Sequence, residues 1–307
     1  MSNFEQMKRS RQDAFSKLTQ QLENLNTKSN KREDDGLYWK PSVDKAGNGF
    51  AVIRFLPAPE GEDVPFVRMF DHGFQGPSGQ WYIENSLTTL GEKDPVSEYN
   101  SVLWNSTSDE NHPNRKQARD QKRRLSYISN IYVVKDPSNP ENEGKVFLYK
   151  YGKKIWDKIQ SAMYPEFDGD VGVNPFDLWE GANFRLKIRQ VDGYRNYDLS
   201  QFDAASPLLN DDAQLEAVWK SEHSLQKLID RANFKSYEEL EARLNLVLGS
   251  TKQIAAAAAI EEENVAAYVP KAKAVEAPSL PTAEDDVPFS TDDDDMAYFE
   301  KLAAGDL

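Results

Sequence analysis

The clearest alternation of apolar and polar positions runs from Asn183 to Val191, over nine residues. Successive side chains of a strand point to opposite faces, so this period of two predicts a half-buried strand. Its polar face would carry Arg185, Lys187 and Arg189. These cations belong either to a solvated outer face or to the wall of a binding groove, and the pattern alone favours neither.

Further strands are predicted where β-branched and aromatic residues are bounded by turn residues. They lie at Phe50–Leu56, Val64–Phe70, Leu125–Val134 and Lys145–Tyr151, with Asp71–Phe74 and Gly79–Glu84 as a turn-linked pair. Helical patterns occupy Lys153–Ile159, Leu215–Arg231 and Ser236–Leu248, and Gly249 is a stop signal. Residues 86–114 predict irregular structure. Short strands without a βαβ rhythm favour a β-rich barrel with insertions.

Both ends of the chain are polar and predict extensions outside the packed core. In residues 1–35, Phe15, Leu18, Leu22 and Leu25 recur at helical spacing and predict a short amphipathic arm. Its cations Lys8, Arg9 and Arg11 are either solvated charges or part of a contact with a neighbouring subunit.

The C-terminal end changes composition twice. Residues 251–281 combine an Ala-rich run with prolines and predict a linker, and residues 282–307 predict a disordered acidic tail. The segment from Leu280 to Leu307 contains nine Asp or Glu residues and one lysine. The apolar cluster Met296-Ala-Tyr-Phe299 with Leu302 predicts a short partner-binding helix.

Composition narrows the class of protein. The chain has 307 residues, no cysteine and three scattered histidines, so neither a disulfide framework nor a Cys-based metal site is expected. No apolar run is long enough for a membrane span or a signal peptide, which predicts a soluble intracellular protein without a membrane partner. The net charge of −14 argues against nucleic acid until its uneven distribution is considered.

The stretch from residue 115 to 158 interleaves cations and tyrosines. Six cations lie within ten residues and are opposed only by Asp120: Arg115, Lys116, Arg119, Lys122, Arg123 and Arg124. The predicted hairpin that follows carries Tyr127, Tyr149, Lys150 and Lys153. Cations attract backbone phosphates and aromatic rings stack on unpaired bases, which favours single-stranded nucleic acid. The alternative is an ordinary hairpin with solvated cations and buried tyrosines.

Several motifs resemble the single-stranded DNA-binding protein of T-even-type bacteriophages. They are Ala46-Gly-Asn-Gly49 with Ala51-Val-Ile-Arg-Phe-Leu-Pro57, the run from Val133 to Phe147, Tyr151-Gly-Lys-Lys-Ile-Trp-Asp-Lys-Ile159 and Trp179-Glu-Gly-Ala-Asn-Phe184. The resemblance covers about residues 36–250. It implies a β-rich α+β fold: an OB-type five-stranded barrel core with an inserted subdomain at about 62–120 and helical additions.

The resemblance also implies a function. The family binds single-stranded DNA cooperatively in replication, recombination and repair, without enzymatic activity, in the cytoplasm of the infected bacterial host. Its DNA contacts match Lys122, Arg123, Arg124, Tyr127 and Tyr149 on the hairpin, Tyr194 and Tyr197 in a loop, and the strand residue Arg54. Its self-association motif matches Lys8, Arg9, Ser10 and Arg11.

The acidic tail is expected to bind other phage proteins, namely a polymerase, a helicase loader and a recombination mediator. Its candidate contact residues are Asp292, Asp293, Asp294, Asp295, Tyr298, Phe299 and Leu302.

One departure from the family concerns metal. The best-known members hold zinc with one His and three Cys, and the matching positions here are His72, Ser86, Asp94 and Ser97. Neutral hydroxyls are poor zinc ligands, so we expect no zinc. We expect Trp81, Tyr82, Ile83 and Leu87 or Leu90 to fill the gap by packing.

A metal-dependent nuclease is the competing hypothesis. It needs clustered carboxylates that hold metal ions. The densest run, Asp292–Asp295, lies in the predicted disordered tail, and no Gly-Lys-Ser/Thr phosphate loop is present. Cleavage of labelled single strands in Mg²⁺ would separate the two hypotheses.

Overall fold

A computed structural model describes residues 36–167, 169–191 and 193–249. Residues 36–40 group with the N-terminal part of the chain, and the described residues from Pro41 onward belong to a second compact unit. The arm residues Lys8, Arg9, Ser10 and Arg11 and the tail residues Asp292–Asp295, Tyr298, Phe299 and Leu302 lie outside the described residues.

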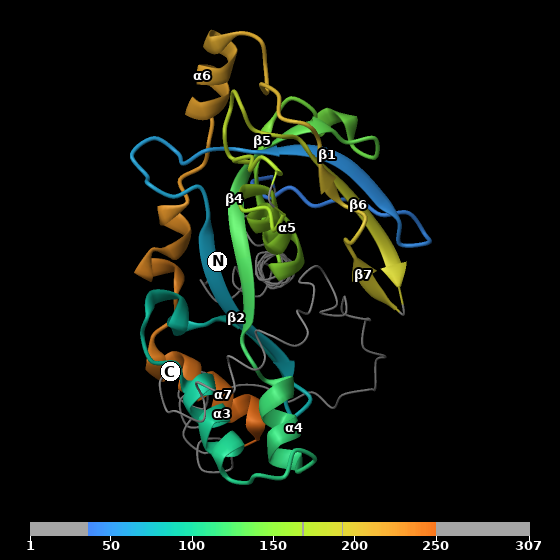
Figure 1. Cartoon of the computed structure of the whole chain (residues 1–307). Helices are drawn as coiled ribbons and strands as arrows, with labels where there is room; N and C mark the ends of the chain where they lie inside the picture. The colour runs from blue at the N-terminus through green and yellow to red at the C-terminus, as the bar shows by residue number, and fades with distance from the viewer. Residues whose placement is uncertain (1–35, 168, 192, 250–307) are drawn as a thin grey trace, which may run out of the picture. The chain divides into compact units, whose positions relative to one another are not determined.

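Eight strands form one antiparallel sheet (Figure 1). Their bounds are β1 Gly49–Phe55, β2 Val67–Gln75, β3 Trp81–Asn85, β4 Arg124–Lys135, β5 Val146–Tyr151, β6 Phe184–Val191, β7 Tyr194–Asn196 and β8 Gln201–Phe202. The order is β3-β2-β4-β1-β6-β7, with β5 paired to β4 and β8 to β6. All the strands predicted from the apolar pattern form, and β2 joins two segments that the sequence had separated.

Strand β4 lies at the centre of this sheet, because its 12 residues pair with three other strands. Its first half pairs with β2, from Asp71↔Arg124 to Val67↔Ile128, and its second half pairs with β1, as in Phe55↔Ile131. Strand β5 occupies the opposite edge, as in Ser129↔Tyr149. The ladders of the described strands leave the sheet open, so these strands form a β-rich antiparallel sheet, as expected, but not a closed barrel.

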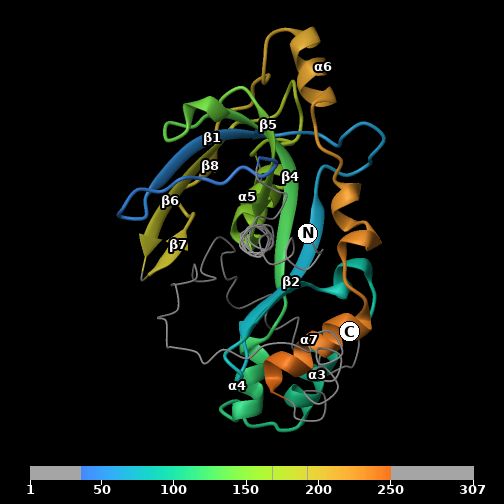
Figure 2. The same ribbon diagram turned by 180° about the vertical axis from the view of Figure 1, so that it is seen from behind.

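Five α-helices and four short 3₁₀ segments complete the described chain. They are η1 Leu87–Leu90, α3 Pro95–Asn105, α4 Pro113–Asp120, η2 Pro140–Asn142, α5 Lys153–Met163, α6 Asp212–Lys220, η3 Gln226–Ile229, η4 Arg231–Asn233 and α7 Tyr237–Leu248. Figures 1 and 2 show α3, α4 and α7 gathered at the end of β2 that lies away from β1 and α6. No described helix has the length and apolar character needed to cross a bilayer.

Two helix predictions were wrong at identifiable places. Residues 86–114 hold η1, α3 and the start of α4, because Asp94 and His112 cap helices that begin at Pro95 and Pro113. The predicted helix Leu215–Arg231 ends at Ser221 and continues as two 3₁₀ turns. In contrast, α7 ends at Gly249 with φ of 71°, as predicted, and its first turn is fixed by a capping box of Ser236 and Glu239.

We call the group of α3, α4 and α7 the α3–α7 subdomain. An apolar cluster packs this subdomain against β2 and β3. Its buried members are Phe74, Tyr82, Leu87, Val96, Phe234, Leu240, Leu244 and Val247. Tyr82 and Leu87 therefore pack as expected, and Leu90 packs against the same cluster. Ile83 does not contribute, since 44% of it is exposed on the outer face of β3.

The positions matched to zinc ligands hold a buried polar network. His72 Nε2 lies 3.3 Å from Asp94 Oδ1, and neither side chain is exposed. Asp94 also accepts hydrogen bonds from Ser86 Oγ at 3.0 Å and from the backbone N–H groups of Leu87, Val96 and Ser97. Burial raises the Asp94 pKa, but His72 and these donors outweigh it and bring the pKa to about 2. Packing alone therefore does not fill this site: a hydrogen-bonded carboxylate occupies its centre.

Glu222 is a buried carboxyl group without hydrogen-bond partners among the described residues. Burial, followed by the charge of Glu62, raises its pKa to about 9. The folded state therefore holds a proton on Glu222 more tightly than the unfolded state does. The resulting contribution to the free energy of unfolding is complete below pH 4.5 and is lost as pH rises through about 9.

We expect Glu222→Gln to raise the thermal midpoint at pH 9 by on the order of 5 °C, with little change at pH 5. The neutral amide removes the need for that proton. Glu60→Gln, which changes an exposed glutamate, is the control and should alter the thermal midpoint at neither pH. An equal shift at both pH values would show that packing rather than protonation is responsible.

Candidate nucleic-acid interface

The predicted basic cluster spans α4, the short link after it and the first residue of β4. Arg115, Lys116 and Arg119 belong to α4, whereas Arg124 opens β4. Lys116 is exposed, and Lys122 and Arg123 are half-buried in the link. The cluster is thus held between the α3–α7 subdomain and the sheet.

Arg115 and Arg119 are both engaged by their own subdomain. Arg115 Nη1 lies 2.5 Å from Glu110 Oε1, and Arg119 forms an ion pair with the other oxygen of the same carboxylate. Both guanidinium groups also lie over the ring of Trp104, at 4.1 and 5.5 Å from its centroid. These two cations therefore stabilise the subdomain, and only part of their charge remains available to a phosphate.

Arg124 and Lys150 meet on one buried carboxylate. Asp71 Oδ1 lies 2.6 Å from Arg124 Nη2, and Asp71 Oδ2 lies 2.9 Å from Lys150 Nζ. Burial raises the Asp71 pKa, but the charges of Lys150 and Arg124 outweigh it and hold the pKa below its ordinary value. Gly73 makes room for this arrangement, because a Cβ there would stand 2.4 Å from Arg124 Nη2. The two cations are thus held side by side across β2, β4 and β5.

A cationic and aromatic pair on β2 was missed by the sequence analysis. Arg68 is exposed, and its guanidinium carbon lies 5.6 Å from the centroid of the Phe70 ring. Arg123 covers the same ring at 4.3 Å. The signal was present, because Arg68 and Phe70 alternate with buried Val67 and Met69.

Three of the predicted tyrosines are structural. Tyr127, Tyr149 and Tyr197 are 6%, 3% and 4% exposed, so in this conformation they offer no face to a base. Tyr127 stacks on Trp156 with centroids 4.4 Å apart, and Tyr149 stacks on Tyr151 at 5.5 Å. Burial raises the pKa of Tyr149 and of Tyr197, consistent with neutral hydroxyls inside the core. Their assignment as stacking residues is corrected here.

Tyr194 is the predicted aromatic residue that the structure leaves open, with 75% of it exposed on β7. The neighbouring strand β6 shows the expected alternation, since Phe184, Leu186 and Ile188 are buried and the intervening cations face outward. Of these cations, Arg185 forms an ion pair with Asp203, with 2.6 Å between Nε and Oδ1, and Lys187 is half-buried. Lys153 on α5 forms an ion pair with Asp157 at 3.2 Å.

Arg54 is a second correction. It is fully buried, and its three nitrogens donate to Asn183 Oδ1, the Asp177 carbonyl and the Ser206 carbonyl at 3.1, 3.2 and 2.6 Å. Desolvation lowers its pKa to about 10, against a smaller rise from the charge of Asp177. Arg54 therefore fastens the segments before β6 and after β8 to β1, and no phosphate can reach it here.

No group of three or more His, Cys, Asp or Glu side chains within the described ranges could hold a metal ion. What the described chain offers is an open antiparallel sheet with exposed and half-buried cations and aromatic rings along β2, β4, α4 and β7. Such a surface is typical of proteins that bind nucleic acid through phosphates and stacked bases.

Comparison with known proteins agrees with this class. A family model described as "gp32 DNA binding protein like" matches residues 47–248. A single-stranded DNA-binding protein of Enterobacteria phage T2 is 43% identical over 235 residues, which cover 74% of each chain. The protein of the same name from Enterobacteria phage T4 is 41% identical over 250 residues, covering 78% of this chain and 80% of the relative. The chain belongs to the gp32-like family of DNA-binding proteins.

Proposed function

We propose that this protein binds single-stranded DNA without sequence preference, as a binding protein and not an enzyme. The observation that carries the proposal is its relationship to the T2 and T4 proteins over most of the chain. The cationic surface across α4, β2 and β4 supports it, because phosphates and unpaired bases are what such a surface attracts. The comparisons lend no support to a nuclease.

The proposed DNA contacts are the accessible members of the predicted set together with the pair found on β2. They are Lys116, Lys122, Arg123, Arg124, Lys150, Tyr194, Arg68 and Phe70. Arg115, Arg119, Lys153, Arg185 and Lys187 are proposed as secondary contacts; four of them pair with a carboxylate, as Arg124 and Lys150 pair with Asp71. We further propose that strands of this sheet form the OB-type core that the resemblance implies.

Incubation of the full chain with labelled single strands and Mg²⁺ tests this function. We expect retarded complexes with intact DNA, for homopolymeric and mixed sequences alike. Cleavage of the strand, or binding that depends on one sequence, would contradict the proposal.

We also propose roles for the two ends. Residues 1–35, through Lys8, Arg9, Ser10 and Arg11, would link neighbouring copies along a strand. Residues 282–307 would bind replication and recombination proteins of the phage within the infected cell, with Tyr298, Phe299 and Leu302 as apolar anchors behind the linker 251–281. The basic arm and the acidic tail supply opposite charges for these two purposes.

The tail should also compete with DNA for the cationic surface. Nine carboxylates on a tether form an intramolecular polyanion with a high effective concentration. We expect truncation after residue 280 to speed association with single strands at low salt, with a gain that shrinks as added ions screen both partners. Stopped-flow association at several salt concentrations measures it, and equal rates for both proteins at low salt would show that the tail does not occlude DNA.

The protein should work without zinc, because Ser86, Ser97 and Asp94 replace the thiolates of the family's metal site. We expect elemental analysis of the purified chain to find less than stoichiometric zinc. Chelators should leave its thermal midpoint unchanged, since metal sites that support folding are lost when the metal is removed. Stoichiometric zinc, or unfolding by a chelator, would refute this expectation.

A further inference from the structure

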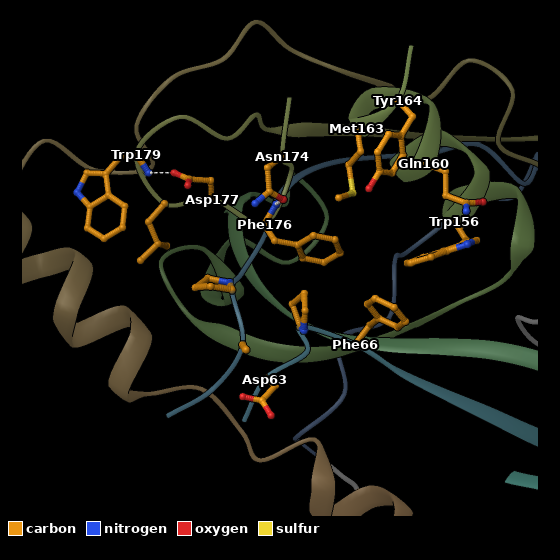
Figure 3. Close-up of a pocket in the computed structure, with 14 residues that line it drawn as sticks. Asp63, Phe66, Trp156, Gln160, Met163, Tyr164, Asn174, Phe176, Asp177 and Trp179 are labelled. Carbon is orange, nitrogen blue, oxygen red and sulfur yellow. Dashed lines mark hydrogen bonds between the residues drawn. The ribbon is translucent and has the colours of Figure 1, made fainter. Parts of the chain in front are cut away.

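A hollow of about 480 Å³ lies beside α5, and we call it the α5 pocket. Three segments line it: the loop after β1, α5 itself and the loop that leads toward β6. Figure 3 shows Phe66, Trp156 and Phe176 with their rings around the space, and Tyr164 and Trp179 at its two ends. Phe66 and Trp156 are in contact, with centroids 4.5 Å apart, so the floor is well packed.

Two apolar residues that line the α5 pocket are exposed: Tyr164 by 74% and Trp179 by 57%. Phe167 and Val171, which follow α5 in the chain, are 75% and 87% exposed. The Val173 N–H donates to the Ala162 carbonyl near the end of α5, at 2.8 Å. Exposed apolar surface gathered around a hollow is typical of a surface that binds a partner.

The charges of the α5 pocket exclude two candidate occupants. Asp63 and Asp177 are the charged side chains among its lining residues. Glu60, Glu166 and Glu180, in the same two loops, are exposed. Both the DNA backbone and the acidic tail would be repelled by these carboxylates. The occupant that fits is a basic segment with apolar anchors.

This chain contains such a segment. Residues 7–25 carry Lys8, Arg9, Arg11 and Lys17 against two acidic residues, and place Phe15, Leu18, Leu22 and Leu25 at helical spacing. We propose that the α5 pocket receives residues 7–25 of a second copy of this chain. The inference rests on the proposed self-association and adds the surface on which it occurs. The apolar side chains enter the hollow, and the cations face Asp63 and the neighbouring glutamates.

Photo-crosslinking in the full chain tests the contact directly. A benzoylphenylalanine at position 15 is introduced into ¹⁵N-labelled protein, which is mixed with unlabelled wild type on a long single strand. We expect crosslinks from the labelled arm to unlabelled peptides that contain Met163, Tyr164 or Trp179. If the labelled arm crosslinks only to labelled peptides, it binds its own chain. If it crosslinks to α4 or β4, it binds the cationic surface. Either result overturns the proposal.

Binding measurements separate this proposal from self-association itself. Two variants weaken the α5 pocket: Trp179→Ala with Asp63→Lys, and Tyr164→Ala alone, at a position 74% exposed. We expect the double variant to bind long strands at least roughly tenfold more weakly, and we expect the same loss after deletion of residues 1–25. Strands that hold one protein should be bound normally by both. The control, Val102→Ala with Glu241→Lys, alters an exposed apolar and an exposed acidic position on α3 and α7.

The outcomes have distinct meanings. If the arm deletion weakens binding to long strands and both pocket variants do not, the arm binds elsewhere and the pocket proposal is wrong while self-association stands. If the arm deletion has no effect on long strands, the proposed self-association fails, and the pocket proposal fails with it.

Discussion

Replacing Lys122 and Arg123 by Ala should lower the affinity for single-stranded DNA by at least about 100-fold at low salt. Each charge-assisted contact to a phosphate contributes about 1.5–3 kcal/mol. The plot of log affinity against log salt should flatten by about 1.4, because each lost contact on a single strand removes about 0.7. The effect should be the same for every base sequence, since phosphates carry no sequence information.

These two residues are preferred to Arg124 for a structural reason. Removing Arg124 would leave buried Asp71 paired with Lys150 alone, and lost stability would be confused with lost contacts. The matched control removes two cations of the α6–η3 segment, with Lys220→Ala and Lys227→Ala. If the control flattened the salt dependence as much as the test variant, the effect would come from net charge and not from this surface.

The Asp94→Ala variant should lose about 3–5 kcal/mol of unfolding free energy, which urea titration measures. The substitution removes the partner of buried His72 and leaves Ser86 and three backbone N–H groups without their acceptor. The low pKa of Asp94 sets the pH window: its contribution is complete above the unfolded value of 3.8 and is lost as pH falls toward about 2. The gap between variant and wild type should therefore narrow in acid.

Asp211→Ala is the matched control for Asp94→Ala. Asp211 also caps a helix, but it is exposed and its side chain accepts a hydrogen bond from the Ala213 N–H alone. Loss of such a cap costs about 1 kcal/mol. Equal losses for the two variants would mean that Asp94 acts only as a helix cap and that the buried network adds nothing.

The strands of this protein were predictable from alternation in β6 and from β-branched and aromatic residues bounded by turns in the others. The alternation at Asn183–Val191 became β6 with its apolar side chains inward, and the hairpin at 125–151 became β4 and β5. Gly249 marked the end of α7 because cap chemistry is local, and the capping box of Ser236 and Glu239 is an equally local signal that the sequence analysis did not use.

Other features depend on contacts that are distant in sequence. Arg54 looked like a strand cation, but its partners lie more than 100 residues away and bury it. Tyr127 and Tyr149 looked like stacking residues, but α5 supplies Trp156 and β5 supplies Tyr151 to cover them. A composition rich in cations and tyrosines therefore could not distinguish residues that build the core from candidate DNA contacts.

One missed element could have been predicted. Asp94-Pro95 places a capping side chain before a proline at the first helical position, which is a local signal for the start of α3. His112-Pro113 is a weaker version of the same arrangement at α4. The abundance of Asn, Ser and Asp in residues 86–114 concealed these signals, although the same residues are favoured at helix caps.

A salt titration of the full chain on single-stranded and duplex DNA of the same length tests the central claim most directly. The account predicts tighter binding to the single strand at every salt concentration, because stacking on exposed rings such as Tyr194 needs unpaired bases. It also predicts a linear fall of log affinity with log salt, since the cationic surface displaces counterions from phosphates. Equal or tighter binding to duplex, or binding to single strands that does not change with salt, would contradict the account.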